Sequence, residues 1–209
     1  SVPISVLQPP PADLVVTSSS IVALPPEIKP GEPIQIDFTV RNDSANPAKG
    51  RWTDVVFLSK DPVWDIGDRP IGSVVHEGDV AQDETYSATV NAFLPSVTPG
   101  DYYAIVRADI LNQVYEAADD DNNISTSSDT IAVSADFIEI GVPFETTLSP
   151  GQERLLAVAV PDPETLQVQL NSSSQFSVHE LFLRQDEAPT TSLFDTDYEG
   201  GLSANLVSV

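Results

Sequence analysis

The chain has 209 residues, 41% of them hydrophobic, which is enough for a packed core in one or two domains. It carries 9 Lys and Arg against 32 Asp and Glu, so its formal net charge is −23 at pH 7. Such a surface repels phosphate and excludes non-specific nucleic-acid binding. The absence of Cys excludes disulfides, Cys-ligated zinc and thiolate nucleophiles. No apolar run approaches the roughly 20 residues that span a bilayer.

The first residues lack a charged segment followed by an apolar stretch, so we expect no signal peptide within them. The chain also contains no Met at all. We therefore expect a piece of a longer protein. The acidic composition without Cys is compatible with a secreted bacterial protein and with a cytosolic one.

Alternating apolar and polar runs, separated by Pro, Gly, Asn and Asp, predict an all-β chain. Residues 1–11 are Pro-rich and read as a linker. Strands are then predicted over 14–24 with a break, 34–40, 52–59, 71–76, 84–94, 101–109 and 124–133. Seven short strands in about 125 residues are typical of an immunoglobulin or fibronectin III sandwich.

A second alternating set begins after Ser134 and Ala135. It predicts strands over 137–140, 144–148, 154–160, 166–170, 178–184 and 206–209. The expected organisation is therefore a linker over 1–11, a first sandwich over 12–135 and a second β domain over 136–209.

Several segments resemble, in the same order, a CARDB-like domain, the cell-adhesion-related module of large bacterial and archaeal surface proteins. They are Ala12–Val16, Lys29–Glu32, Phe38–Asn42, Trp52–Ser59, Gly100–Tyr103 and Val114–Asn123. The resemblance covers about residues 11–135. It implies a seven-stranded fibronectin-like sandwich, repeated in extracellular chains and without catalytic activity of its own.

The second part of the chain is similar to the start of a bacterial pre-peptidase C-terminal (PPC-like) domain. The similar segments are Gly141–Phe144, Leu148–Glu153, Val158–Pro161, Leu166–Val168, Glu180–Leu183 and Ala188–Thr190. Leu155 and Leu156 stand where that family commonly has an aromatic residue, and the family adds strands beyond Val209. The resemblance implies a truncated, jelly-roll-like accessory module with an unpaired sheet edge.

Two acidic loops are candidate calcium sites, because calcium binds six to eight oxygen atoms. Asp61, Asp65 and Asp68 lie in the first loop, and Glu116, Asp119 and Asp121 lie in the second. The two loops are expected at opposite ends of the sandwich and would form separate sites. The alternative is that both loops face water. Asp61 and Asp65 would then accept backbone N–H groups in Asx turns, and Asn122 and Asn123 would hold the second turn through side-chain to backbone bonds.

A third segment, 195–199, begins like an EF-hand loop. It has Leu206 where that motif needs a bidentate Glu, and no helices flank it. Its acidic residues are a weaker calcium candidate, and the alternative is a plain surface loop.

No catalytic constellation stands out. His76 and His179 are the two histidines, and Leu183 occupies the position of the second His in an H-E-x-x-H motif. A G-x-S-x-G elbow is missing. Trp52 is expected in the core, and Trp64 is expected either to cover the core edge or to act as a surface contact.

These observations predict a non-catalytic extracellular module that serves adhesion, spacing or domain presentation, with calcium as the one cofactor weighed. Its expected partners are neighbouring domains of the same polypeptide and surface protein or carbohydrate ligands. Carbohydrate binding would require exposed aromatic residues on one sheet face. The alternative function is an accessory segment of a secreted hydrolase, foremost a peptidase, that aids folding, secretion or substrate engagement.

Overall fold

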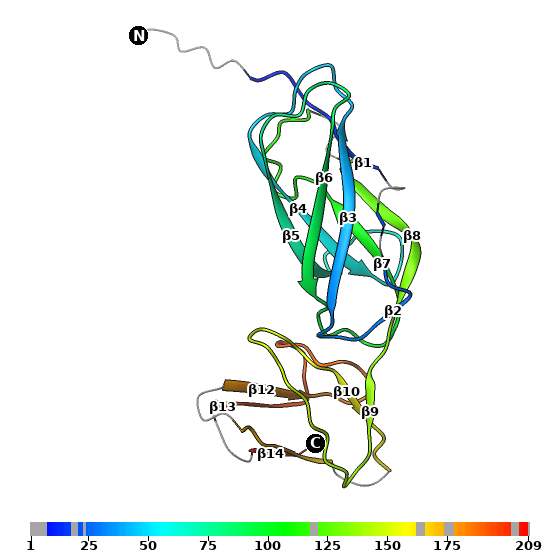
Figure 1. Ribbon diagram of the computed structural model, residues 1–209, viewed down its shortest axis with the longest axis vertical. Helices are drawn as coiled ribbons and strands as arrows, with labels where there is room; N and C mark the ends of the chain where they lie inside the picture. The colour runs from blue at the N-terminus through cyan, green and yellow to red at the C-terminus, as the bar shows by residue number, and fades with distance from the viewer. Residues whose placement is uncertain are drawn as a thin grey trace. The chain divides into compact units, whose positions relative to one another are not determined.

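The computed structural model describes residues 8–17, 21–22, 24–117, 121–161, 166–173, 178–201 and 205–208. Every element in these ranges is a β-strand, which confirms the all-β prediction. No helix in this described part is long and apolar enough to cross a membrane. The chain divides into two compact units (Figure 1).

Unit 1 comprises residues 1–28, 33–93 and 101–132 and contains two stacked sheets. The three-stranded sheet has the order β1 (Leu14–Val16), β3 (Pro33–Asn42) and β6 (Thr85–Phe93). The five-stranded sheet has the order β2 (Glu27–Ile28), β8 (Ile124–Val133), β7 (Gly100–Arg107), β4 (Arg51–Ser59) and β5 (Arg69–Glu77). The core lies between the two sheets.

The alternation of β3 shows why these residues form a half-buried strand. Ile34, Ile36, Phe38 and Val40 are buried, whereas the residues between them are partly or fully exposed. Fully burying one such side chain stabilises the fold by roughly 2 kcal/mol. Across the core, Trp52 on β4 is 0% exposed, which confirms its predicted core position.

The first predicted strand, 14–24, is shorter than expected. β1 ends at Val16, and Val22 forms only an isolated bridge to Asp37. The two-residue strand β2 follows and was not predicted. Pro25 and Pro26 lie between Val22 and β2, and neither has an N–H group with which to extend a ladder. Residues 18–20, where the break was expected, lie outside the described residues.

Unit 2 comprises residues 29–32, 94–100 and 133–209. Its described strands form three two-stranded sheets. β9 (Asp136–Ile138) pairs in parallel with β10 (Leu156–Val158). β11 (Gln167–Leu170) pairs with β14 (Asn205–Ser208), and β12 (Val178–Leu183) pairs with β13 (Thr196–Gly201), both antiparallel.

The predicted strand over 144–148 is wrong, because this segment has no regular structure and all five of its residues are exposed. Pro143 precedes it and Pro150 follows it, so ladder donors are missing on both sides. A jelly-roll for this region stays a prediction.

Charged and backbone groups pin the start of β9 within unit 2. The Asp136 carboxylate contacts Lys29 Nζ at 2.5 Å and Arg154 at 2.7 Å. The Lys29 hydrogen bond is the main cause that lowers the pKa of Asp136. Gly31 has φ of +85°, and a Cβ there would lie 1.8 Å from the Glu153 carbonyl oxygen, so only glycine fits.

Candidate functional site

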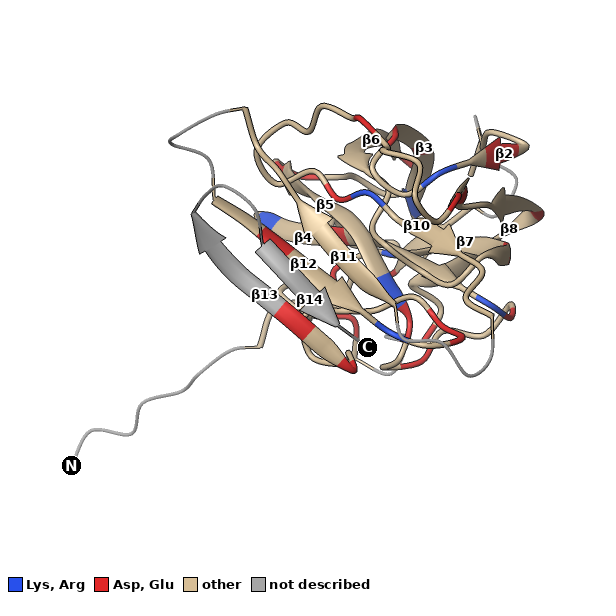
Figure 2. Cartoon of the chain, turned by 90° about the horizontal axis from the view of Figure 1, so that it is seen from below, with Lys and Arg blue, Asp and Glu red and all other residues tan. Residues whose placement is uncertain are grey.

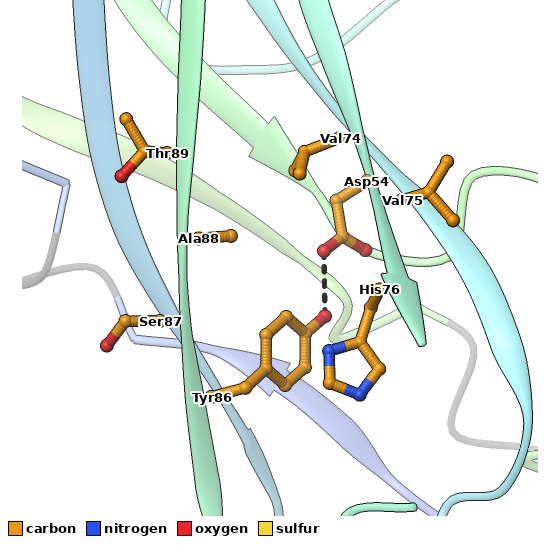
Figure 3. A pocket seen from close by; sticks show the side chains of 8 residues that line it. All are labelled: Asp54, Val74, Val75, His76, Tyr86, Ser87, Ala88 and Thr89. Atoms are coloured by element: carbon orange, nitrogen blue, oxygen red, sulfur yellow. Dashed lines mark hydrogen bonds between the residues drawn. The ribbon is translucent and has the colours of Figure 1, made fainter. Parts of the chain in front are cut away.

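A buried polar network lies in the core of unit 1, on a strand face that is otherwise apolar. Asp54 is on β4, two residues after Trp52, so the pleat turns both side chains inward, and Asp54 is 0% exposed. Its Oδ2 accepts a hydrogen bond from the Tyr86 hydroxyl at 2.8 Å (Figure 3), and its Oδ1 accepts the Asp109 N–H at 3.0 Å. The Tyr86 oxygen accepts the Trp52 Nε1–H at 2.9 Å.

Three rings cover this carboxylate. His76 on β5 is paired across the sheet with Trp52, and the two ring centroids are 4.2 Å apart. The His76 ring also lies 4.0 Å from the Tyr86 ring, which comes from β6 in the other sheet. The cluster therefore joins the two sheets through both stacking and hydrogen bonds.

Burial decides the electrostatics of the network. It raises the pKa of Asp54 from 3.8 to about 6, although the Asp109 N–H and the Tyr86 hydroxyl partly oppose this rise. Burial also raises the pKa of Tyr86 and lowers the pKa of His76. At neutral pH the network thus contains one carboxylate, a neutral phenol and a neutral imidazole.

A pocket of about 190 Å³ opens beside this network, between β5 and β6 (Figure 3). It is lined by Asp54, Val74, Val75, His76, Tyr86, Ser87, Ala88 and Thr89. Small-molecule sites usually have volumes of about 300 to 1,000 Å³. The pocket is smaller than that, and both Asp54 oxygens already accept internal hydrogen bonds. The arrangement holds two sheets together and is poorly suited to hold a substrate.

The carboxylates predicted in the first acidic loop bond to their own loop. Asp61 Oδ1 accepts the Val63 N–H at 2.8 Å, and Asp65 Oδ1 accepts the Gly67 N–H at 2.6 Å. Asp68 Oδ2 accepts the Asp65 N–H at 2.9 Å. The first two are the bonds of Asx turns, and the third is a local bond back to the amide three residues earlier.

The acidic residues predicted in the second loop do not lie in one environment. Glu116 is 1% exposed, and its Oε1 accepts the Leu14 N–H of β1 at 2.9 Å, across 102 residues of sequence. Asp121 is exposed, and Asp119 lies outside the described residues. Among the residues that the structure describes, no three Asp, Glu or His side chains gather closely enough to hold a metal ion.

The third acidic segment, 195–199, is not the loop that the EF-hand comparison requires. From Thr196 onward it forms β13, which pairs with β12. Asp195 precedes the strand, and its Oδ2 accepts the Gln185 N–H at 2.7 Å. Strand pairing to β12 extends the backbone, so the acidic positions do not curl around a common point.

Trp64 was expected either to cover the core edge or to act as a surface contact. It packs against the five-stranded sheet. Its ring lies 4.4 Å from the Arg107 guanidinium and meets the Phe57 ring edge-on at 5.8 Å. It is half-buried by these contacts. The neighbouring loop residues Val63 and Ile66 are the ones that extend into solvent, at 68% and 94% exposure.

Sequence reasoning missed the Asp54 network, although one signal was available. Asp54 interrupts the inward apolar series of Trp52, Val56 and Leu58 on β4. A carboxylate in the inward phase of a buried strand requires partners. The partners themselves, Tyr86 and the Asp109 amide, were not readable from this pattern.

The CARDB family model matches residues 11–127. A CARDB domain from Pyrococcus furiosus, crystallised in complex with di-metal ions, is 18% identical with a TM-score of 0.41. The match covers 62% of this chain and 95% of that domain. A solution structure of a CARDB domain from the same organism gives 17% identity, a TM-score of 0.40 and coverage of 59% and 95%.

A β-glucosidase from Listeria innocua matches at 12% identity and a TM-score of 0.38. It covers 59% of this chain, and the chain spans only 16% of that enzyme. No curated protein matches the chain. The CARDB domain is a non-catalytic module that often occurs in extracellular bacterial proteins. The family model matches more than half of the chain, which therefore belongs to the CARDB family.

Proposed function

We propose that the chain is a non-catalytic extracellular module of a larger bacterial surface or secreted protein. It spaces, presents or attaches neighbouring domains, and in this way serves adhesion. The observation that carries the proposal is the use of three buried acids, Asp54, Asp109 and Glu116, as internal acceptors. Carboxylates that accept hydrogen bonds from the chain's own N–H and O–H groups stabilise its conformation, and the oxygen atoms that accept these bonds are not available to bind a substrate.

Asp109 shows this use most clearly. It is 1% exposed and follows β7. Its Oδ1 accepts the Gln113 N–H at 2.9 Å, and its Oδ2 accepts the Val114 N–H at 2.6 Å. Such bonds hold the loop after β7 in one conformation. A spacer that transmits force between its two ends needs loops that keep their conformation.

The surface charge supports the same proposal. Acidic residues far outnumber Lys and Arg (Figure 2), and the net charge is −23. A charge of this size keeps a secreted chain soluble and keeps it away from other acidic surfaces. Residues 136–209 are proposed as a PPC-like accessory module on the strength of the segments that resemble that family.

The parent reading frame tests this proposal. Further CARDB-like repeats or other surface modules beside this chain are the expected result. A catalytic peptidase or glycosidase domain beside it would overturn the spacer role and support an accessory segment of a hydrolase. A glycan array probed with the full chain tests carbohydrate ligands separately, and bound glycans would add a recognition role.

Calcium stabilisation of the acidic loops is a separate proposal, supported by the acidic composition of residues 61–68 and 116–121. Calcium that binds only the folded state raises the melting temperature, because it adds RT ln(1 + [L]/Kd) to stability. We expect a higher melting temperature in millimolar calcium than in EDTA. Matched NaCl is the control, since screening also stabilises a highly charged chain. Coincident melting curves at equal ionic strength would remove calcium from the proposal.

A further inference from the structure

Two long edge strands lie side by side along one border of unit 1. β6 ends the three-stranded sheet, and β5 ends the five-stranded sheet (Figure 1). They approach closely, since a Cβ on Gly72 of β5 would lie 2.8 Å from Val90 of β6. Edge strands expose unpaired N–H and C=O groups, and most proteins protect them with charges, Pro, bulges or short length.

β5 has such protection. Arg69 and Glu77 lie at its two ends, and Pro70 has no N–H to offer. Its register against β4 also shifts between Val56 and Phe57, which marks a bulge. These features make β5 a poor template for a further strand.

β6 has none of these protections. Its nine residues, TYSATVNAF, include no charged residue and no Pro, in a chain that is 20% charged. It runs against β3 in nine consecutive pairs without a register shift. β6 therefore presents a long, regular and uncharged edge.

The ladder shows which groups of β6 face outward. The Asn42 N–H donates to the Glu84 carbonyl at 3.0 Å, and the Leu94 N–H donates to the Glu32 carbonyl at 2.9 Å. Hydrogen-bonded and non-hydrogen-bonded pairs alternate along an antiparallel ladder. The even-numbered residues of β6 thus bond to β3. The backbone groups that face the open edge belong to Thr85, Ser87, Thr89, Asn91 and Phe93.

We propose that β6 pairs antiparallel with β6 of a second copy of this chain, so that two three-stranded sheets become one continuous sheet. Maximum overlap puts Thr89 opposite Thr89 of the other copy. Ser87 then faces Asn91 and Thr85 faces Phe93, in pairs that stabilise antiparallel strands. Phe93, which is 44% exposed, loses exposed surface in this arrangement.

The distribution of charge favours a second copy in this orientation. The connection between β5 and β6 carries Asp79, Asp83 and Glu84, and Glu77 ends β5 just before it, whereas Leu94–Gly100 after β6 carries no charge. Antiparallel pairing puts the acidic end of one copy beside the uncharged end of the other. Parallel pairing would bring the two acidic ends together and is disfavoured. The remaining repulsion between two copies of charge −23 is screened by salt, so high salt strengthens the dimer.

Sedimentation of the full chain tests the proposal. The mass is measured up to millimolar chain concentration, at physiological and at high salt. We expect dimerisation that increases with concentration and with salt. Ser87→Glu with Asn91→Glu puts acids opposite each other across the pair and should give a monomer. Ser87→Lys with Asn91→Glu puts opposite charges at the same places and should restore the dimer.

A matched control carries the same added charge one strand away. Gln35 and Thr39 on β3 lie opposite Asn91 and Ser87 in the same sheet. Gln35→Glu with Thr39→Glu should therefore leave the dimer largely intact, and circular dichroism confirms that each variant is folded. A monomer under all conditions would overturn the proposal. So would a dimer that survives the two β6 acids, or one that the β3 control abolishes equally. This test is independent of the spacer role.

Discussion

The Asp54 carboxylate makes a specific prediction for stability as a function of pH. Burial raises its pKa in the folded state to about 6, whereas its ordinary value is 3.8. The folded state therefore keeps a proton that the unfolded state has already lost between these two values. Stability from this group is complete below pH 3.8 and falls as pH rises to about 6. A difference of about two pKa units corresponds to roughly 3 kcal/mol.

The perturbation is Asp54→Asn, which keeps the shape of the side chain and removes its titration. The amide oxygen can accept the Asp109 N–H, and the amide nitrogen can donate to the Tyr86 oxygen. The assay is urea unfolding of the wild type and the variant across this pH range. We expect the wild type to lose about 3 kcal/mol relative to the variant as pH rises from about 3 to about 7.

Subtracting the two curves removes the general effect of the −23 charge, which both proteins share apart from one group. Asp79→Asn removes the same charge from an exposed turn and controls for that remaining difference. A constant stability difference between the wild type and Asp54→Asn across the pH range would refute the reasoning. So would a carboxyl carbon resonance of Asp54 that titrates near 4 instead of near 6.

Two further substitutions test the hydrogen-bond acceptors Tyr86 and Glu116, which stabilise unit 1. Tyr86→Phe removes the hydroxyl between Trp52 and Asp54 and leaves a buried donor and a buried acceptor unpaired. We expect a loss of about 3 kcal/mol in urea unfolding and a higher Asp54 pKa, and a change below about 0.5 kcal/mol would contradict the network. Glu116→Ala removes the acceptor of the Leu14 N–H. It should cost about 2 kcal/mol and speed hydrogen exchange at Leu14, and unchanged exchange there would show that Glu116 does not hold β1.

The sequence alone predicted the architecture of unit 1 well, because sheet strands have a local period of two. The buried series on β3 and the core position of Trp52 follow directly from that period. The prediction of strands failed where a segment forms a strand only if another strand pairs with it. Residues 144–148 alternate in the same way, yet they form no strand, whereas 196–199 lie in β13 because β12 pairs with them.

The acidic loops show the same division. The bonds of Asp61 and Asp65 join each side chain to the amide two residues later, so local sequence was enough to suggest these Asx turns. Glu116 lay in the same kind of acidic run, but its partner on β1 is 102 residues away. Only the packing of β1 brought that amide to the carboxylate.

What the sequence determined by itself is the all-β class, the excess of negative charge and the uncharged composition of residues 85–93. These depend on residue type and local period alone. The tertiary structure decided that 85–93 is an open edge and that Asp54 meets Tyr86 from the opposite sheet. Both depend on how sheets are ordered and stacked, and a hydrogen bond between sheets leaves no periodic trace in the chain.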